Sequence, residues 1–278
     1  MRYVSTRGGV QGLSFCDAVM MGLADDGGLL VPDTIPDVSE DLPQLADKSY
    51  VDLAAYVMGH FIDDIPADDL RSIIERSYET FDDQAVTPLV DVGDIHVLEL
   101  FHGPTLAFKD FAMQLIGQMF EATLKRRGER VTIVGATSGD TGSAAMEAFR
   151  GLEAADVFII YPHGRISEVQ RRQMTTPSES NVHALAMDGD FDECQARLKE
   201  MFNDFEFRDG VRLAGVNSIN WARVLAQVVY YFSSAVSLGA PQREISFTVP
   251  TGNFGDVFAG YIATRMGLTI SRLIVATN

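Results

Sequence analysis

The stretch VTIVGATSGDTG, at residues 131–142, decides the fold class. It begins with β-branched apolar residues, which predict a buried strand, and runs through a glycine-rich turn into a helical pattern. The same succession recurs along most of the chain. Further strand-like runs lie at residues 95–100, 157–161, 182–187, 245–249 and 273–276. Helical patterns separate most of these runs, at residues 110–127, 141–150, 167–174, 191–205, 221–238 and 255–266.

This alternation predicts an α/β fold with two parallel-sheet domains, because near-continuous apolar strands are covered by helices on both faces. Ligands of such folds bind at the carboxyl ends of the strands, so residues that directly follow a strand are candidates for a site. The first ninety or so residues look mostly helical instead, with Ser14 as an N-cap and helical patterns at residues 49–61 and 68–78. We expect an N-terminal helical region, a smaller α/β domain and the beginning of a larger α/β domain. These parts cover residues 1–92, 93–215 and 216–278.

The composition argues against several classes of function. The formal net charge is −17, which repels nucleic acid and anionic membranes. No run reaches the ~20 apolar residues of a membrane span, and the N-terminus lacks the apolar core of a signal peptide. Cys16 and Cys194 share no metal-binding spacing and have no CxxC partner, so we expect reduced, buried thiols and no metal site. These features predict a soluble, cytoplasmic protein.

Lys109 is the candidate for covalent chemistry. The other three lysines, Lys48, Lys125 and Lys199, lie among polar residues. Lys109 instead lies in the sequence LAFKDFA, after a strand and at a helix start. Apolar surroundings and a helix N-terminus both favour the neutral amine, which can attack an aldehyde. The alternative is a lysine that pairs with Asp110 or extends to water.

Two glycine-containing loops follow strands and open helices. GATSGDTG at residues 135–142 and PTGNFGD at residues 250–256 each expose backbone N–H groups, which can hold a carboxylate or a phosphate. Neither loop matches the Walker or the dinucleotide fingerprint, so a nucleotide-binding protein is disfavoured. The alternative for each loop is an ordinary capped turn. Together with one lysine in an apolar context, the loops indicate a site for a phosphorylated aldehyde cofactor and an amino-acid carboxylate.

A fourth segment, NSINWAR at residues 217–223, combines amide, hydroxyl and guanidinium donors. Asn220 and Arg223 are three residues apart and share a helix face, where they could hold a second anion. The alternative is an N-cap at Ser218 or Asn220 with Arg223 in a surface salt bridge.

These segments, in this order, resemble the threonine synthase family of fold-type-II pyridoxal-phosphate enzymes. The resemblance rests on FHGPTLAFKDF (101–111), ATSGDTG (136–142), NSINWAR (217–223) and PTGNFGD (250–256), with YVSTRGG (3–9) and GGLLVP (27–32) near the N-terminus. It covers essentially the whole chain. It implies the tryptophan synthase β-like architecture, with two parallel-sheet domains and pyridoxal 5'-phosphate as cofactor.

Site roles carry over from the resemblance by position. Lys109 would hold the cofactor as a Schiff base. The residues implied to bind the cofactor, besides Lys109, are Thr251, Gly252, Asn253, Phe254 and Gly255. Those implied to bind the substrate are Ser138, Gly139, Asp140, Thr141, Asn217, Ser218, Asn220 and Arg223.

The reaction that the resemblance implies is the conversion of O-phospho-L-homoserine and water to L-threonine and phosphate. One alternative is a phospholyase of the same cofactor class that ends at a keto acid. The chain ends at Asn278 directly after a strand-like run, and the family's partner for the pyridine nitrogen should lie further on. We therefore expect a fragment whose C-terminal part is missing, and a second alternative is an inactive piece that only binds cofactor or a partner. The sequence does not determine the oligomeric state.

Overall fold

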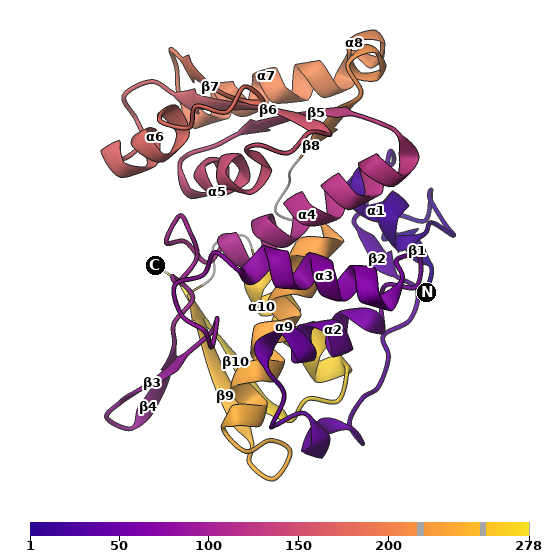
Figure 1. Cartoon of the computed structure of the whole chain (residues 1–278), viewed down its shortest axis with the longest axis vertical. Coiled ribbons are helices and arrows are strands. Elements are labelled where there is room, and N and C mark those ends of the chain that lie inside the picture. Colours follow the sequence, from indigo (N-terminus) through magenta and orange to yellow (C-terminus); the bar gives the residue numbers. More distant parts are fainter. Residues whose placement is uncertain (216–219, 251–253, 278) are drawn as a thin grey trace.

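A four-stranded parallel sheet forms one lobe of the computed structural model, which describes residues 1–215, 220–250 and 254–277 (Figure 1). The strand order is β7-β6-β5-β8, and every pair is parallel. The strands are β5 (Val131–Ala136), β6 (Ala155–Pro162), β7 (Val182–Met187) and β8 (Leu213–Gly215). The helices of this lobe are α5 (Asp140–Phe149), α6 (Glu168–Thr175), α7 (Phe191–Asn203) and α8 (Phe205–Gly210). Helix α7 covers one face of the sheet and α5 the other, as expected for α/β layers (Figure 1).

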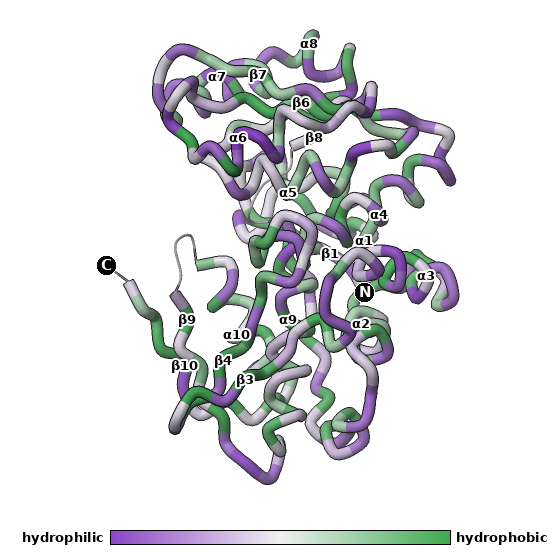
Figure 2. The backbone as a smooth tube through the Cα atoms, turned by 60° about the vertical axis from the view of Figure 1, so that its left-hand side comes forward, coloured by the Kyte–Doolittle hydropathy of each residue, from purple (hydrophilic) through white to green (hydrophobic). Residues whose placement is uncertain are grey.

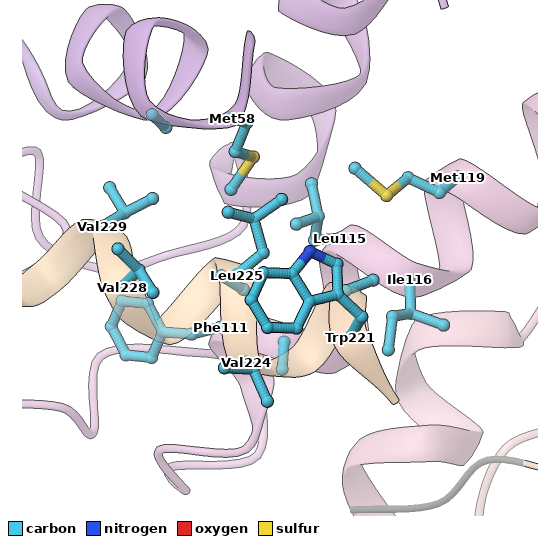
Figure 3. Close-up of a cluster of buried hydrophobic side chains, with 14 of the residues drawn as sticks. Met58, Phe111, Leu115, Ile116, Met119, Trp221, Val224, Leu225, Val228 and Val229 are labelled. Carbon is cyan, nitrogen blue, oxygen red and sulfur yellow. The ribbon is translucent and has the colours of Figure 1, made fainter. Parts of the chain in front are cut away.

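The second lobe is built around α9 (Trp221–Ser237), which is buried along nearly its whole length. Beside it lie β9 (Ile245–Pro250), α10 (Gly255–Arg265) and β10 (Ile270–Ala276), and β9 and β10 form a parallel pair. Helix α4 (Asp110–Arg127) joins the lobes, because it contacts α5 on one side and α9 on the other. Figure 3 shows the apolar contact between α4 and α9, where Phe111, Leu115 and Ile116 meet Trp221 and Leu225.

In residues 1–92, the longest regular elements before β3 (Leu89–Val92) are three α-helices. This region contains β1 (Tyr3–Ser5), α1 (Phe15–Met21), β2 (Leu30–Pro32), the 3-10 turn η1 (Leu42–Gln44), α2 (Tyr50–Gly59) and α3 (Ala67–Tyr78). Ser14 caps α1, since its side chain accepts the N–H of Asp17. Figure 2 shows hydrophilic and hydrophobic residues alternating along α3, whose apolar side packs on α4. Helix α2 also contacts α9, so this region shares a core with the segment that begins at residue 220.

The strand predicted at residues 95–100 does not join a parallel sheet. It forms β4 (Ile95–Leu98), which pairs antiparallel with β3 (Leu89–Val92) in a separate hairpin (Figure 1). The reason is a two-residue turn at Gly93, whose φ of 62° suits the tight connection. Polar residues also interrupt the apolar ones on these strands, so the hairpin lies in solvent, with Ile95 61% exposed. Strands β1, β2 and β8 were not predicted, because each has only three residues, and the six-residue helix α8 is too short for a clear helical pattern.

Both cysteines are buried free thiols, as predicted. Within the described ranges, no helix is long and apolar enough to cross a membrane.

Candidate active site

Lys109 stands at the N-cap of α4, directly before the helix that joins the lobes. Its Nζ lies 3.2 Å from Oδ2 of Asp140 and 4.7 Å from the centre of the Phe108 ring. The side chain is 19% exposed, whereas the side chain of Lys125 is 53% exposed. The structure thus places Lys109 against the glycine loop at the start of α5. Lys109 and this loop were both candidates from the sequence.

Asp110 does not pair with Lys109. Its carboxylate faces the preceding loop, where it accepts hydrogen bonds from the backbone N–H (2.8 Å) and the hydroxyl (2.7 Å) of Thr105. Gly103 allows this fold-back, because a Cβ there would lie 2.5 Å from the Asp110 side chain. Burial raises the pKa of Asp110, although the two Thr105 donors oppose the rise. Asp110 therefore fixes the loop that carries Lys109, a role that sequence reasoning missed.

Replacing Asp110 with alanine should destabilise the fold by about 1–3 kcal/mol, because two donors of Thr105 would be left buried without their acceptor. Urea unfolding of the two proteins measures the difference. Asp47→Ala, at an exposed position far from α4, is the control and should change stability by less than about 0.5 kcal/mol. Equal stability of Asp110→Ala and the parent chain would contradict this role.

The loop between β5 and α5 is shaped by Thr137. Its hydroxyl accepts the N–H groups of Gly139 (3.0 Å) and Gly142 (2.9 Å), so these two amides are occupied. The N–H groups of Ser138, Asp140 and Thr141 remain without an acceptor in the part of the chain that the structure describes. Unpaired N–H groups at a helix N-terminus favour an anion.

A pocket of about 400 Å³ opens beside this loop. Residues 105–108, Asp140 at the rim and the first turns of α6 line it. The lining residues at the start of α6 are Ser167, Val169, Gln170 and Gln173. None of these four residues was predicted from the sequence to belong to the site. The available signal was a serine followed three residues later by glutamine at a helix start, a spacing that usually indicates only a capping box.

The second glycine loop lies only partly within the described residues. Thr251, Gly252 and Asn253 fall outside them. Phe254 is the N-cap of α10 with a φ of 64°, and Gly255 begins the helix. The loop that was predicted to hold a phosphate therefore ends at a helix N-terminus, as the sequence indicated.

Tyr230 links the start of α10 to the helix of Lys109. Its ring packs against Phe111 at 5.8 Å, two residues after Lys109, and its hydroxyl donates to Oδ1 of Asp256 at 2.5 Å. Tyr231 donates to the same oxygen at 3.1 Å. The N-terminal turns of α4 and α10 are thus joined through one side chain of α9.

Asp256 gives a pH-dependent prediction. Burial raises its pKa above the usual value of 3.8, and the two tyrosine hydroxyls oppose the rise only in part. Because the pKa of Asp256 is higher in the folded state than in the unfolded chain, the protonated carboxyl group stabilises the fold. This contribution is complete below pH 3.8 and is lost as the pH rises through the folded-state pKa. Asp256→Asn keeps an oxygen acceptor but carries no charge, so its stability relative to the parent should increase between pH 4 and pH 8. Urea unfolding across this range measures the trend, and a flat or falling difference would refute it.

The fourth predicted segment is divided. Asn217 and Ser218 lie outside the described residues. Asn220 is the N-cap of α9: its Oδ1 accepts the N–H of Ala222, and its Nδ2 donates to the carbonyl of Val19. Both ends of this amide are therefore engaged within the protein, which agrees with the N-cap alternative.

Arg223 does not form the surface salt bridge that was its alternative. Its residue is 3% exposed, and Nε and Nη1 have no hydrogen-bond partner among the described residues. Burial lowers the pKa of the guanidinium to about 10. Gln227 and Tyr230 follow Arg223 at helical spacing, so the three polar side chains lie on one face of α9. The last of them, Tyr230, donates to Asp256. A buried, unpaired cation is costly, which points to an anionic ligand.

Two family models together match nearly all of the chain. One, described as threonine synthase N terminus, matches residues 2–78. The other, described as pyridoxal-phosphate dependent enzyme, matches residues 81–278. The chain belongs to the pyridoxal-phosphate-dependent enzyme family. It is similar to threonine synthases of bacteria and yeast.

The threonine synthase of Pseudomonas aeruginosa is 54% identical over 281 residues, which cover 100% of this chain and 60% of that protein. The Saccharomyces cerevisiae enzyme is 48% identical, over 96% of this chain and 55% of its own length. The crystal structure of pyridoxal-phosphate-bound threonine synthase from Brucella melitensis aligns with a TM-score of 0.96 at 58% identity and covers 100% of this chain and 61% of that one. The chain therefore spans about 60% of the length of these relatives.

Proposed function

We propose that this chain carries the lysine site of a threonine synthase, which converts O-phospho-L-homoserine and water to L-threonine and phosphate with pyridoxal phosphate. One observation carries the proposal: Lys109 lies beside a pocket and against a helix N-terminus where the N–H groups of Ser138, Asp140 and Thr141 have no acceptor among the described residues. A lysine and an anion cradle at one pocket suit an aldehyde and an amino acid. We also propose a cytoplasmic location, supported by the two free thiols.

The residues present fit the cofactor. Lys109 would bond its aldehyde carbon, because its largely buried side chain lies beside the pocket. Residues 251–255 would hold its phosphate at the start of α10, where the helix dipole favours an anion. The link from Phe111 through Tyr230 to Asp256 keeps these two helix starts together. When bound, the cofactor supplies an electron sink for the carbon that bears the substrate's amino group.

Other residues of the chain would bind the two anionic groups of the substrate. The N–H groups of Ser138, Asp140 and Thr141 would hold the substrate carboxylate. Arg223, with help from Asn217 and Ser218, would hold the substrate phosphate until it leaves from Cγ. Asn220 would act indirectly, by fixing the start of α9.

Lys109 would move protons once the substrate amine has displaced it. Its Nζ would remove a proton at Cα and one at Cβ, so that phosphate can leave from Cγ. Protons would then be returned to Cγ and Cα, while water adds at Cβ. Phe108 lines the pocket beside Lys109 and would limit the access of other water molecules. The products then balance: one water enters, and one phosphate and one threonine leave.

The test is product analysis. The chain is incubated with pyridoxal phosphate and O-phospho-L-homoserine, and inorganic phosphate and L-threonine are measured together. We expect the two products in equal amounts. Phosphate accompanied by a keto acid and ammonia would replace this proposal with the phospholyase, and the absence of both products would overturn it for this chain.

A further inference from the structure

We propose that Gln170 on α6 is a positioning residue for Lys109, and that it acts through Asp140. Gln170 Nε2 donates to Oδ1 of Asp140, while Lys109 Nζ donates to Oδ2 of the same carboxylate at 3.2 Å. Asp140 thus bridges the two side chains with one oxygen each. The inference rests on the proposed function, because it concerns the direction in which Lys109 presents its amine.

The side chain of Gln170 departs from its expected local use. Ser167 caps α6 and accepts the N–H of Gln170 at 3.2 Å, as in the first half of a capping box. In a complete box, the glutamine would return to the backbone of Ser167. Here the carboxamide instead crosses to the start of α5. The carboxamide of Gln170 therefore bonds to Asp140 in the pocket and not to the backbone of Ser167.

The glycine loop leaves space for this carboxamide. Gly139 has a φ of 148°, and a Cβ there would lie 2.3 Å from Oε1 of Gln170. Ser143 Oγ also donates to the carbonyl of Gln170 at 3.4 Å, which ties α6 to α5 a second time. Any side chain at position 139 would push Gln170 away from Asp140, so the glycine serves this contact as well as the turn.

Asp140 needs such a support. Its side chain is 46% exposed, and a carboxylate at the rim of a pocket can rotate freely unless both oxygens are held. With Gln170 in place, one oxygen is fixed and the other faces Lys109. Without Gln170, Asp140 could rotate, and the lysine amine would lose its fixed direction. Small errors in the placement of a reacting group slow a reaction strongly.

The experiment measures how fast Lys109 captures pyridoxal phosphate, by borohydride reduction at timed intervals followed by peptide mass analysis. Gln170→Met keeps the length of the side chain but removes its donor, and we expect capture about tenfold slower. Gln118→Met is the matched control, since it removes a comparable bond, to Arg76 at 2.9 Å, elsewhere on the surface. Its capture rate should equal that of the parent.

A second background separates positioning from general damage. In Asp140→Asn, the carboxylate is already lost, so adding Gln170→Met should slow capture by no more than about twofold. An undiminished tenfold loss in that background, or an unchanged rate for Gln170→Met alone, would overturn the role of Gln170. If Gln170→Met fails to fold, Gln170→Asn, which is one methylene too short to reach Asp140, should show the same loss. Label on a lysine other than Lys109 in the parent would instead refute the proposed function.

Discussion

Lys109→Ala is expected to abolish covalent capture of pyridoxal phosphate and to reduce phosphate release from O-phospho-L-homoserine by at least about 10³-fold. In the proposed function, the lysine supplies both the amine that holds the cofactor and the base that moves protons at the substrate. No second amine can replace it nearby, because Lys48, Lys125 and Lys199 all lie exposed and outside the pocket. A residue with two roles in one reaction gives the largest loss when it is removed.

Borohydride reduction and peptide mass analysis provide the measurement. In the parent chain the label should appear on the peptide that contains Lys109, and in Lys109→Ala no peptide should carry it. Lys125→Ala is the control, because Lys125 forms exposed ion pairs with Glu121 and Glu153 and is remote from the pocket. It should be labelled like the parent. A parent chain labelled on Lys48, Lys125 or Lys199 would show that the assignment to Lys109 is wrong.

The sequence predicted the long helices and the loops after the strands well, because both have strong local signals. Residues 110–127 were predicted as a helix and form α4 with those bounds. The glycine loops lie at helix starts, where backbone conformation and unpaired N–H groups are set locally. The distinct environment of Lys109 was also evident from its neighbours.

Contacts between distant segments could not be predicted in the same way. From the sequence, Asn220 and Arg223 had the same interpretation, as donors to an anion. In the structure, Asn220 bonds to Val19, about two hundred residues earlier, whereas Nε and Nη1 of the buried Arg223 have no partner among the described residues. The pocket lining from α6 depends on the crossover from β6 to β7, and its glutamines have no unusual local pattern. The hairpin at residues 89–98 was not predicted, although its signal is local: Gly93, with a positive φ, allows a two-residue turn between the paired strands.

Arg223→Met is expected to weaken binding of the substrate phosphate by on the order of 100-fold while making the unliganded chain more stable. The guanidinium is buried, and its Nε and Nη1 have no partner in the described parts of the chain. Burial lowers its pKa to about 10, as expected for a charge that has lost its hydration and has no counter-ion among the described residues. Replacing an unpaired buried cation with an apolar side chain of similar length should stabilise the fold by about 1–4 kcal/mol.

Two measurements made together test this expectation. Urea unfolding without phosphate should show the gain in stability, and added O-phospho-L-homoserine should stabilise the parent but not the variant, because a ligand stabilises only the state that binds it. Arg126→Met is the matched control: Arg126 donates to the carbonyl of Asp64 at 3.0 Å on the far part of α4. That change should lower stability slightly and leave the effect of the ligand intact.

The opposite signs of the two effects make the result decisive. A purely structural arginine, held by contacts within the fold, would lose stability when replaced and would leave ligand binding unchanged. A ligand-binding arginine is kept at a cost to the unliganded fold, because the anion that neutralises it arrives only with the substrate. If Arg223→Met lowers stability and the substrate still stabilises the variant as it does the parent, Arg223 is a structural residue and the substrate phosphate must bind elsewhere.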